Sequence, residues 1–85
     1  MNHSCDPNTW FEKDGSMSAR RDIEAEEEIT YDYATSENRS NFSLICRCGS
    51  PECRGTVRGN DFATNDKLQK RYGDHIMPHV RRETL

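Results

Sequence analysis

Apolar residues in this chain occur in short groups separated by long polar stretches. Residues 8–11 (Asn-Thr-Trp-Phe) are rich in β-formers and follow Pro7, which restricts the preceding residue to extended geometry. The Asp-Gly dipeptide within residues 13–16 favours a hairpin turn. We therefore predict that residues 16–23 return as a second strand.

A cleaner alternation follows at residues 29–33, where Ile29, Tyr31 and Tyr33 share one face of a predicted third strand. Residues 24–28 before it are too polar to bury and predict a loop. From these residues alone, ordinary packing is enough to explain both tyrosines.

The second half of the chain predicts little regular structure. Residues 42–45 are a short apolar lead into a turn-rich segment. Residues 61–66 offer caps for a helix at about 67–72, ended by Gly73, and Pro78 is expected to interrupt any continuation. The predicted fold class is mainly β with a short C-terminal helix.

Composition limits the core that this chain can build. It has 85 residues, of which 32% are apolar and 32% charged, and its mean hydropathy is −1.07. A chain of this size usually depends on a metal, disulfides or a partner for stability. We expect one thin-cored domain at most.

Charge and the lack of long apolar runs exclude several classes. No run approaches the ~20 residues of a membrane span and no secretory leader is visible, so we expect an intracellular protein without membrane contact. A net charge of −3 argues against direct nucleic-acid binding. Residues 22–32 are acidic and residues 67–82 basic. The acidic stretch either forms a solvent-exposed face or attracts a Lys/Arg-rich peptide.

The four cysteines are distributed as one early thiol and a late trio. Cys46-x-Cys48-x4-Cys53 presents three thiols in one turn-rich loop, and Cys5 is the remaining cysteine. Close spacing without a secretory signal favours metal over disulfides, and structural zinc takes four ligands. We predict a four-cysteine Zn²⁺ site; two disulfides or free thiols are the alternatives.

Two further features bear on that prediction. Arg47 and Arg54 flank the trio and would offset the negative charge of four thiolates. His75-x3-His79 allows a two-Cys, two-His scheme, but that scheme leaves Cys46 unused and Pro78 would disrupt the helix presenting both histidines. We therefore expect both histidines to be exposed to solvent.

Three motifs, in this order, resemble the C-terminal half of the SET-domain protein-lysine methyltransferases. They are Asn-His-Ser-Cys-Asp-Pro-Asn at residues 2–8, Glu-Ile-Thr-Tyr-Asp-Tyr at 28–33, and the cysteine trio running into Arg54-Gly55, which matches the post-SET motif. The resemblance covers residues 1–57 and implies a partial SET domain of the β-clip type, with a four-cysteine zinc knuckle. A weaker likeness to short SET proteins covers residues 59–73. We divide the chain into a SET segment (1–45), a post-SET segment (46–57) and a C-terminal extension (58–85).

The resemblance implies a role for each matched residue. Asn2 and His3 would contact S-adenosylmethionine, and Tyr33 would be the active-site tyrosine beside the methyl donor. Tyr31 stands where the family carries Phe or Tyr, and its hydroxyl would bias a complete enzyme toward monomethylation. Cys5 would complete the post-SET zinc site. The implied partner is a Lys-containing, histone-like protein or peptide; oligomeric state is not implied.

The chain also departs from the family pattern. It has no Gly-x-Gly of the kind found in the family's upstream cofactor loop, Met1 falls one residue before the first motif, and Glu26 replaces the usual Gly before Glu-Glu. We expect a fragment that binds cofactor weakly and is inactive alone. The alternative hypothesis is a non-catalytic, zinc-stabilised structural or interaction module.

Overall fold

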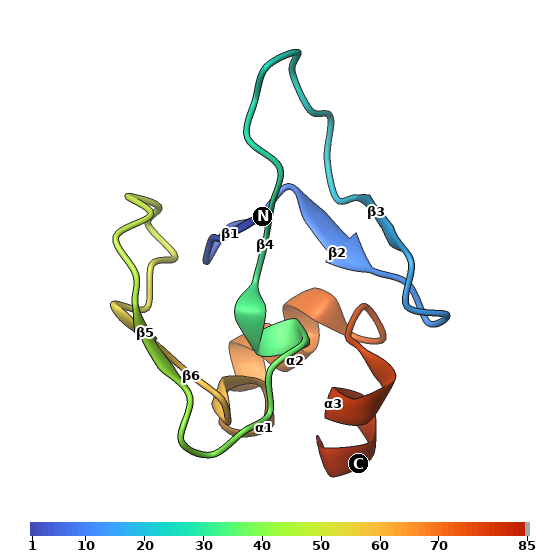
Figure 1. Ribbon diagram of the computed structural model, residues 1–85, viewed down its shortest axis with the longest axis vertical. Coiled ribbons are helices and arrows are strands. Elements are labelled where there is room, and N and C mark those ends of the chain that lie inside the picture. The colour runs from blue at the N-terminus through green and yellow to red at the C-terminus, as the bar shows by residue number, and fades with distance from the viewer. Residues whose placement is uncertain (85) are drawn as a thin grey trace.

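The computed structural model of the chain describes residues 1–84, with side chains up to Arg81. Short strands pair two by two, a 3₁₀ turn lies at the centre, and α-helices form the C-terminal part (Figure 1). The strands are β1 (Asn2–His3), β2 (Thr9–Phe11), β3 (Met17–Ala19), β4 (Thr30–Tyr31), β5 (Ser43–Ile45) and β6 (Thr56–Arg58); the helices are η1 (Tyr33–Thr35), α1 (Asp61–Thr64), α2 (Asp66–Tyr72) and α3 (Pro78–Thr84).

The predicted hairpin is present as β2 and β3. Thr9 pairs with Ala19 and Phe11 with Met17 in antiparallel register. The turn is closed by the Glu12 amide, which donates to the Ser16 carbonyl at 2.7 Å. The returning strand is shorter than the predicted residues 16–23, since it ends at Ala19.

Strands β1 and β4 pair in parallel, Asn2 with Thr30 and His3 with Tyr31. This pairing places the first and second sequence motifs side by side. The predicted strand over residues 29–33 is wrong in its second half, because the chain turns into η1 at Tyr33. The cause is the Asp32 carboxylate, which accepts the Ala34 amide at 3.0 Å and caps this turn.

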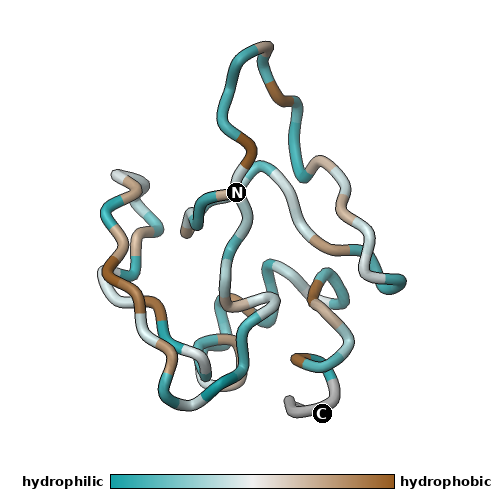
Figure 2. Tube along the Cα trace, in the orientation of Figure 1, coloured by the Kyte–Doolittle hydropathy of each residue, from teal (hydrophilic) through white to brown (hydrophobic). Residues whose placement is uncertain are grey.

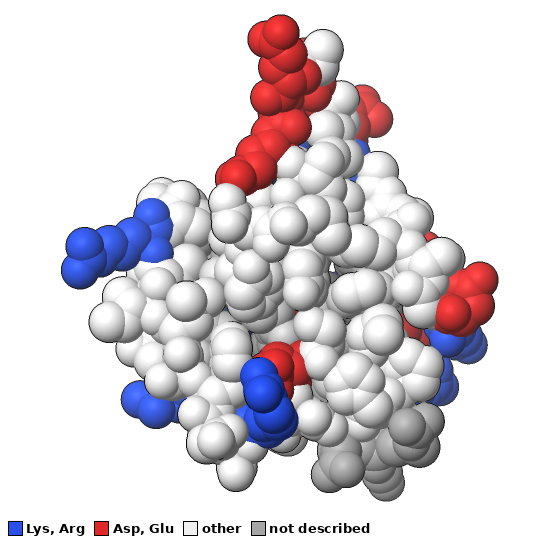
Figure 3. Space-filling view, viewed as in Figure 1, with Lys and Arg blue, Asp and Glu red and all other residues white. Residues whose placement is uncertain are grey.

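The acidic residues before β4 form the loop that sequence predicted, and it projects from the body of the molecule (Figures 1 and 3). Asn8, only 1% exposed, anchors its end. The Asn8 side chain accepts the Thr30 amide at 2.9 Å and donates to the Glu28 carbonyl at 2.8 Å. The last residue of the first motif therefore sets the position of β4.

Within this loop, the Glu27 amide bonds the Glu24 carbonyl at 3.1 Å, and Glu26 at the third turn position has φ 71°. A type II turn requires positive φ there, which favours glycine. We expect Glu26→Gly to raise the free energy of unfolding by about 0.5–1 kcal/mol, because it removes left-handed strain that exceeds the added chain entropy. Thermal denaturation measures this. Ala25→Gly, one position earlier, should instead destabilise; equal effects would contradict the explanation.

The C-terminal helices pack onto the SET-like segment and supply most of one core cluster. Ala34 and the partly buried Trp10 contact it from the first half of the chain. The members from the tail are Phe62 in α1, Leu68 and Tyr72 in α2, Ile76 in the link before α3, and Val80 in α3.

Two of the three helices differ from prediction. The predicted helix at 67–72 is confirmed as α2, capped by Asn65 and ended at Gly73. Residues 61–64 form α1 rather than only a cap. Pro78 begins α3 instead of interrupting the helix, since the first helical position needs no amide donor.

Strongly apolar segments remain short and scattered along the trace (Figure 2). A second core cluster consists of Cys5, Cys46 and Val57, with Tyr33, Phe42, Leu44 and Cys53 packed against it. The sulfur atoms themselves therefore form part of the interior. None of the helices in residues 1–84 is long and apolar enough to cross a membrane.

Candidate metal centre and tyrosine site

The four cysteine sulfurs converge as the sequence predicted. The Sγ atoms of Cys5, Cys46, Cys48 and Cys53 lie within 4.8 Å of one another, and all four are free thiols. The Cys5 and Cys46 sulfurs are 3.7 Å apart, and a tetrahedral zinc with ~2.3 Å bonds needs about 3.8 Å between ligands. The donor set and spacing therefore fit zinc, and no disulfide bond joins these four cysteines.

Local structure explains this convergence. Cys46 follows β5 and its amide donates to the Gly55 carbonyl at 2.7 Å, which closes the base of the knuckle between β5 and β6. Gly49 and Gly55 have φ of 75° and 76°, so the knuckle turns use conformations that favour glycine. Cys5 reaches the trio because β1 is held against β4.

Burial divides the thiols into an inner and an outer set. Cys5 is fully buried, and burial raises its pKa to about 12. Burial acts the same way on exposed Cys48, but amide hydrogen bonds from Ser50 and Cys5 and the neighbouring thiols outweigh it and lower its pKa to about 7. The centre thus has one open edge toward solvent.

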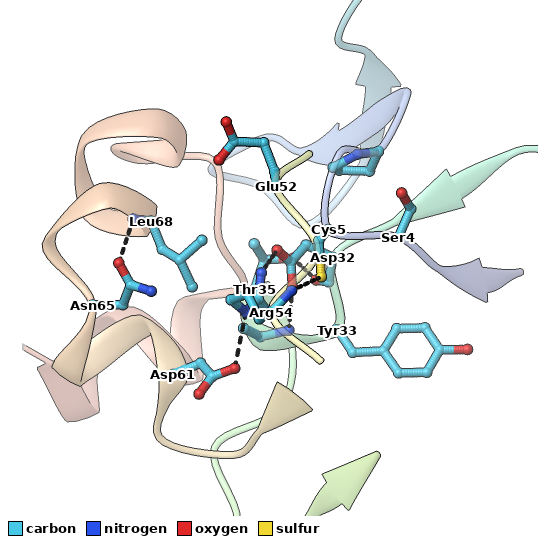
Figure 4. A network of polar contacts seen from close by, with 12 residues as sticks. Ser4, Cys5, Asp32, Tyr33, Thr35, Glu52, Arg54, Asp61, Asn65 and Leu68 are labelled. Carbon is cyan, nitrogen blue, oxygen red and sulfur yellow. Dashed lines mark hydrogen bonds and ion pairs between the residues drawn. The ribbon is translucent and has the colours of Figure 1, made fainter. Parts of the chain in front are cut away.

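Arg54 was predicted beside the sulfurs, and the structure adds a second role. Its backbone amide donates to the Cys5 sulfur at 3.3 Å, while its guanidinium turns to Asp32 at 2.7 and 2.9 Å and to Asp61 at 3.1 Å (Figure 4). Arg47 is exposed. Arg54 therefore contacts the Cys5 sulfur through its backbone amide and the two carboxylates through its guanidinium.

Asp32 is the buried centre of this network. Its side chain has no exposed surface and also accepts the Tyr72 hydroxyl at 2.9 Å. Burial raises the pKa of Asp32, but the hydrogen bonds and charge of Arg54 outweigh it, so the pKa is lowered overall. Asp32 is charged at neutral pH and joins η1, the knuckle and α2.

His3 connects the sulfurs to Tyr33. The Tyr33 amide donates to Nδ1 of His3 at 3.0 Å, so the ring proton of neutral His3 lies on Nε2, which is 3.3 Å from the Cys5 sulfur. Burial lowers the pKa of His3, although Asp32 opposes this, and favours the neutral ring. Neighbouring Asn2 is exposed and donates to the Glu28 carboxylate at 2.6 Å.

The two tyrosines adjoin even though only Tyr31 lies in a strand. Their ring centroids are 4.9 Å apart, and Phe11 packs edge-on to Tyr31 at 5.4 Å. The Tyr33 hydroxyl donates to the Met1 carbonyl at 2.8 Å. Tyr31 receives a long hydrogen bond from Ser36 at 3.4 Å. The pair forms an aromatic wall next to β1.

A cavity of about 310 Å³ joins these parts. Its lining combines both residues predicted to bind cofactor, one predicted catalytic tyrosine and two of the sulfur ligands, with Tyr31 outside it. Among the described residues the lining is Asn2, His3, Tyr33, Leu44, Ile45, Cys46, Arg47 and Cys48.

The tail histidines are not part of the sulfur cluster. His75 stacks on Trp10 at 3.6 Å between ring centroids and bonds the Phe11 carbonyl at 3.0 Å. His79 lies 2.6 Å from the Ser36 carbonyl. The prediction that both are solvent-exposed is therefore wrong, because they attach the tail to the SET-like segment.

Sequence reasoning missed the polar contacts made by Asp32, Arg71 and Tyr72. The position of Asp32 between two aromatic residues was the one available signal, since an acidic residue at the end of a short strand must find a partner if it is buried. Arg71 and Tyr72 lie in the helical tail, and nothing in their local pattern indicated contacts with the first motif.

Comparison with known proteins gives the family that part of this chain resembles. The SET-domain family model matches residues 1–34. Histone-lysine N-methyltransferase ash1 of Drosophila melanogaster is 41% identical over 66 residues, 69% of this chain and 3% of its own length. Histone-lysine N-methyltransferase TRX1 of Oryza sativa subsp. japonica is 41% identical over 79 residues, 82% of this chain and 7% of its length. The Saccharomyces cerevisiae enzyme named as H3 lysine-4 specific is 41% identical over 63 residues, 65% of this chain and 6% of its length.

The chain therefore carries a segment that belongs to the SET-domain family, within a longer stretch that resembles histone-lysine methyltransferases. It spans between 3% and 7% of the length of these relatives. No solved structure matches it.

Proposed function

We propose that this chain provides the zinc-bearing C-terminal half of an S-adenosylmethionine-dependent protein-lysine N-methyltransferase. The observation that carries the proposal is the cavity of about 310 Å³ where Asn2, His3 and Tyr33 meet beside Cys46 and Cys48. Its volume lies at the lower end of the ~300–1,000 Å³ usual for ligand sites, so these residues would form one side of a cofactor pocket.

S-adenosylmethionine supplies, when bound, a methyl group on a sulfonium sulfur. A lysine side chain, with a reference pKa of ~10.4, must lose its proton before it can accept that methyl. The aromatic wall of Tyr31, Tyr33 and Phe11 would lower the lysine pKa by excluding water. The Tyr33 hydroxyl, which donates to the Met1 carbonyl here, would instead form a hydrogen bond with the lysine amine and so orient the amine. The Tyr31 hydroxyl would limit the number of methyl groups added.

Zinc would have a structural role here. Four cysteines leave no open position for substrate or water, which is typical of structural rather than catalytic zinc. Because the His3 Nε2 proton points at the Cys5 sulfur and Nδ1 accepts the Tyr33 amide, the metal would stabilise the side of the cavity that carries both residues.

The relatives are named as histone-lysine methyltransferases, which supports a Lys-containing, histone-like protein substrate and a nuclear location. Basic peptides would be attracted by the projecting acidic loop at residues 22–28 (Figure 3). This attraction is electrostatic and should weaken as salt is raised.

An NMR titration of the zinc-loaded, ¹⁵N-labelled chain with S-adenosylmethionine tests the proposal. We expect amide shifts confined to the cavity, at Asn2, His3, Tyr33 and Leu44, because these residues line it. The affinity should be weaker than ~10 μM, about 7 kcal/mol, since the 85 residues contain no Gly-x-Gly cofactor loop. Methyl transfer by the chain alone should be absent or very slow.

ATP, which has the adenosine but a triphosphate in place of the amino-acid moiety, is the matched control and should shift these amides less. S-adenosylhomocysteine should shift the same set. If millimolar S-adenosylmethionine moved no cavity amide in a chain that retained its zinc, the methyltransferase proposal would be wrong. The non-catalytic zinc-stabilised module would then be the better explanation.

A further inference from the structure

Arg71 of α2 touches both halves of the sulfur centre. One guanidinium nitrogen donates to the backbone carbonyl of Cys5 at 2.7 Å, and another donates to the Glu52 carboxylate in the knuckle at 2.9 Å. The Arg71 side chain is only 17% exposed. One residue of the helical tail thus bridges the early cysteine and the loop that holds the late trio.

This bridge is not a by-product of close packing. A polar pocket of about 230 Å³ separates the knuckle from α2, lined by Cys53 and Arg54 on one side and by Asn65 and Leu68 on the other. Arg71 also lines this pocket and reaches from α2 to Glu52 of the knuckle. Its guanidinium is further held over the Tyr72 ring, 5.7 Å from the centroid.

We propose that Arg71 is a positioning residue of the metal centre. It sets Cys5 against the knuckle through its two-pronged contact, so that the tail beyond the SET-like segment becomes part of the site. A planar guanidinium suits this role because it can hold two acceptors in a fixed geometry. Its positive charge also offsets the negative charge that four thiolates carry around zinc. The inference rests on the zinc site of the proposed function.

Zinc affinity of the full chain, measured by competition with a chromophoric chelator, tests it. We expect Arg71→Ala to weaken zinc binding about 10-fold or more, the range found when groups that support metal ligands are removed. Arg71→Lys should recover part of the lost zinc affinity, because lysine keeps the positive charge but cannot hold two acceptors in a fixed geometry. Lys70→Ala, an exposed neighbour in the same helix, should leave the affinity unchanged.

A second measurement separates positioning from overall stability. Ile76→Val weakens the tail core, where Ile76 is 3% exposed, without altering a residue that contacts the knuckle. Each variant is compared at a temperature equally far below its own melting temperature. In zinc-loaded protein, Arg71→Ala should expose Cys5 to alkylation by iodoacetamide, detected by mass spectrometry, whereas Ile76→Val should leave it protected.

Glu52→Gln gives an independent check, since Glu52 is half exposed and its replacement should not disturb folding. Alone, Glu52→Gln should weaken zinc binding modestly. Added to Arg71→Ala, it should cause no further loss of zinc affinity. The role of Arg71 would be overturned if zinc affinity were unchanged in Arg71→Ala, or if Arg71→Ala and Ile76→Val lost the same zinc affinity. Either result would leave the metal centre itself standing. A native chain that bound no zinc would overturn the metal centre itself.

Discussion

Removing zinc is expected to unfold this chain at 25 °C. A chain of 85 residues has roughly 4–13 kcal/mol of total stability at typical values per residue. Structural zinc contributes ~10–16 kcal/mol of binding free energy in small domains near pH 7. The metal term is therefore comparable to the whole or larger, and one of the two core clusters is built on Cys5 and Cys46.

The measurement is near-UV circular dichroism of the tyrosines and Trp10, with metal analysis, before and after addition of a strong chelator. We expect one zinc per chain, loss of the signal on stripping, and its return when zinc is added back. His75→Gln should retain full zinc content, because His75 stacks on Trp10 and lies outside the sulfur cluster. A stripped chain that melted within a few degrees of the loaded one would refute the dependence.

Cysteine spacing was enough to predict the sulfur centre, because four thiols in a thin-cored chain leave few ligand sets. The geometry around Tyr33 was not predictable in the same way. Alternation at residues 29–33 is a local signal, and it was overridden by the side chain of Asp32, which caps η1 instead of allowing the strand to continue. The tyrosine rings nevertheless adjoin, so the two residues lie side by side as predicted but on a different backbone.

The contribution of the tail could not be obtained from local patterns either. Helix α2 was predictable from its cap and its terminal Gly73. Its contacts with the first half of the chain involve polar atoms far apart in sequence, such as Arg71 with Cys5 and Tyr72 with Asp32. Hydrophobic periodicity identifies which face of a helix is buried, but it does not identify the hydrogen-bond partners there.

Asp32→Asn is expected to lower the free energy of unfolding by about 3–5 kcal/mol, the cost of removing one partner from a buried ion pair. The variant leaves Arg54, whose side chain is 12% exposed, without its bidentate acceptor. Because the pKa of Asp32 is lowered in the folded chain, its stabilisation is fully present above the unfolded value of ~3.9 and is lost as pH falls through the folded value. Denaturation of the zinc-loaded protein at pH 7 therefore reports the full effect.

The same substitution at an exposed ion pair provides the control. Asp74 is 54% exposed and pairs with Lys13 at 3.4 Å, so Asp74→Asn should change stability by less than ~1 kcal/mol. If the loss in Asp32→Asn comes from a buried guanidinium that keeps only Asp61 as a charged partner, then adding Arg54→Gln should recover part of it. A double variant that lost as much stability as the two single variants together would mean that Asp32 and Arg54 act independently, and the charge pairing that joins Tyr33 to the knuckle would be secondary.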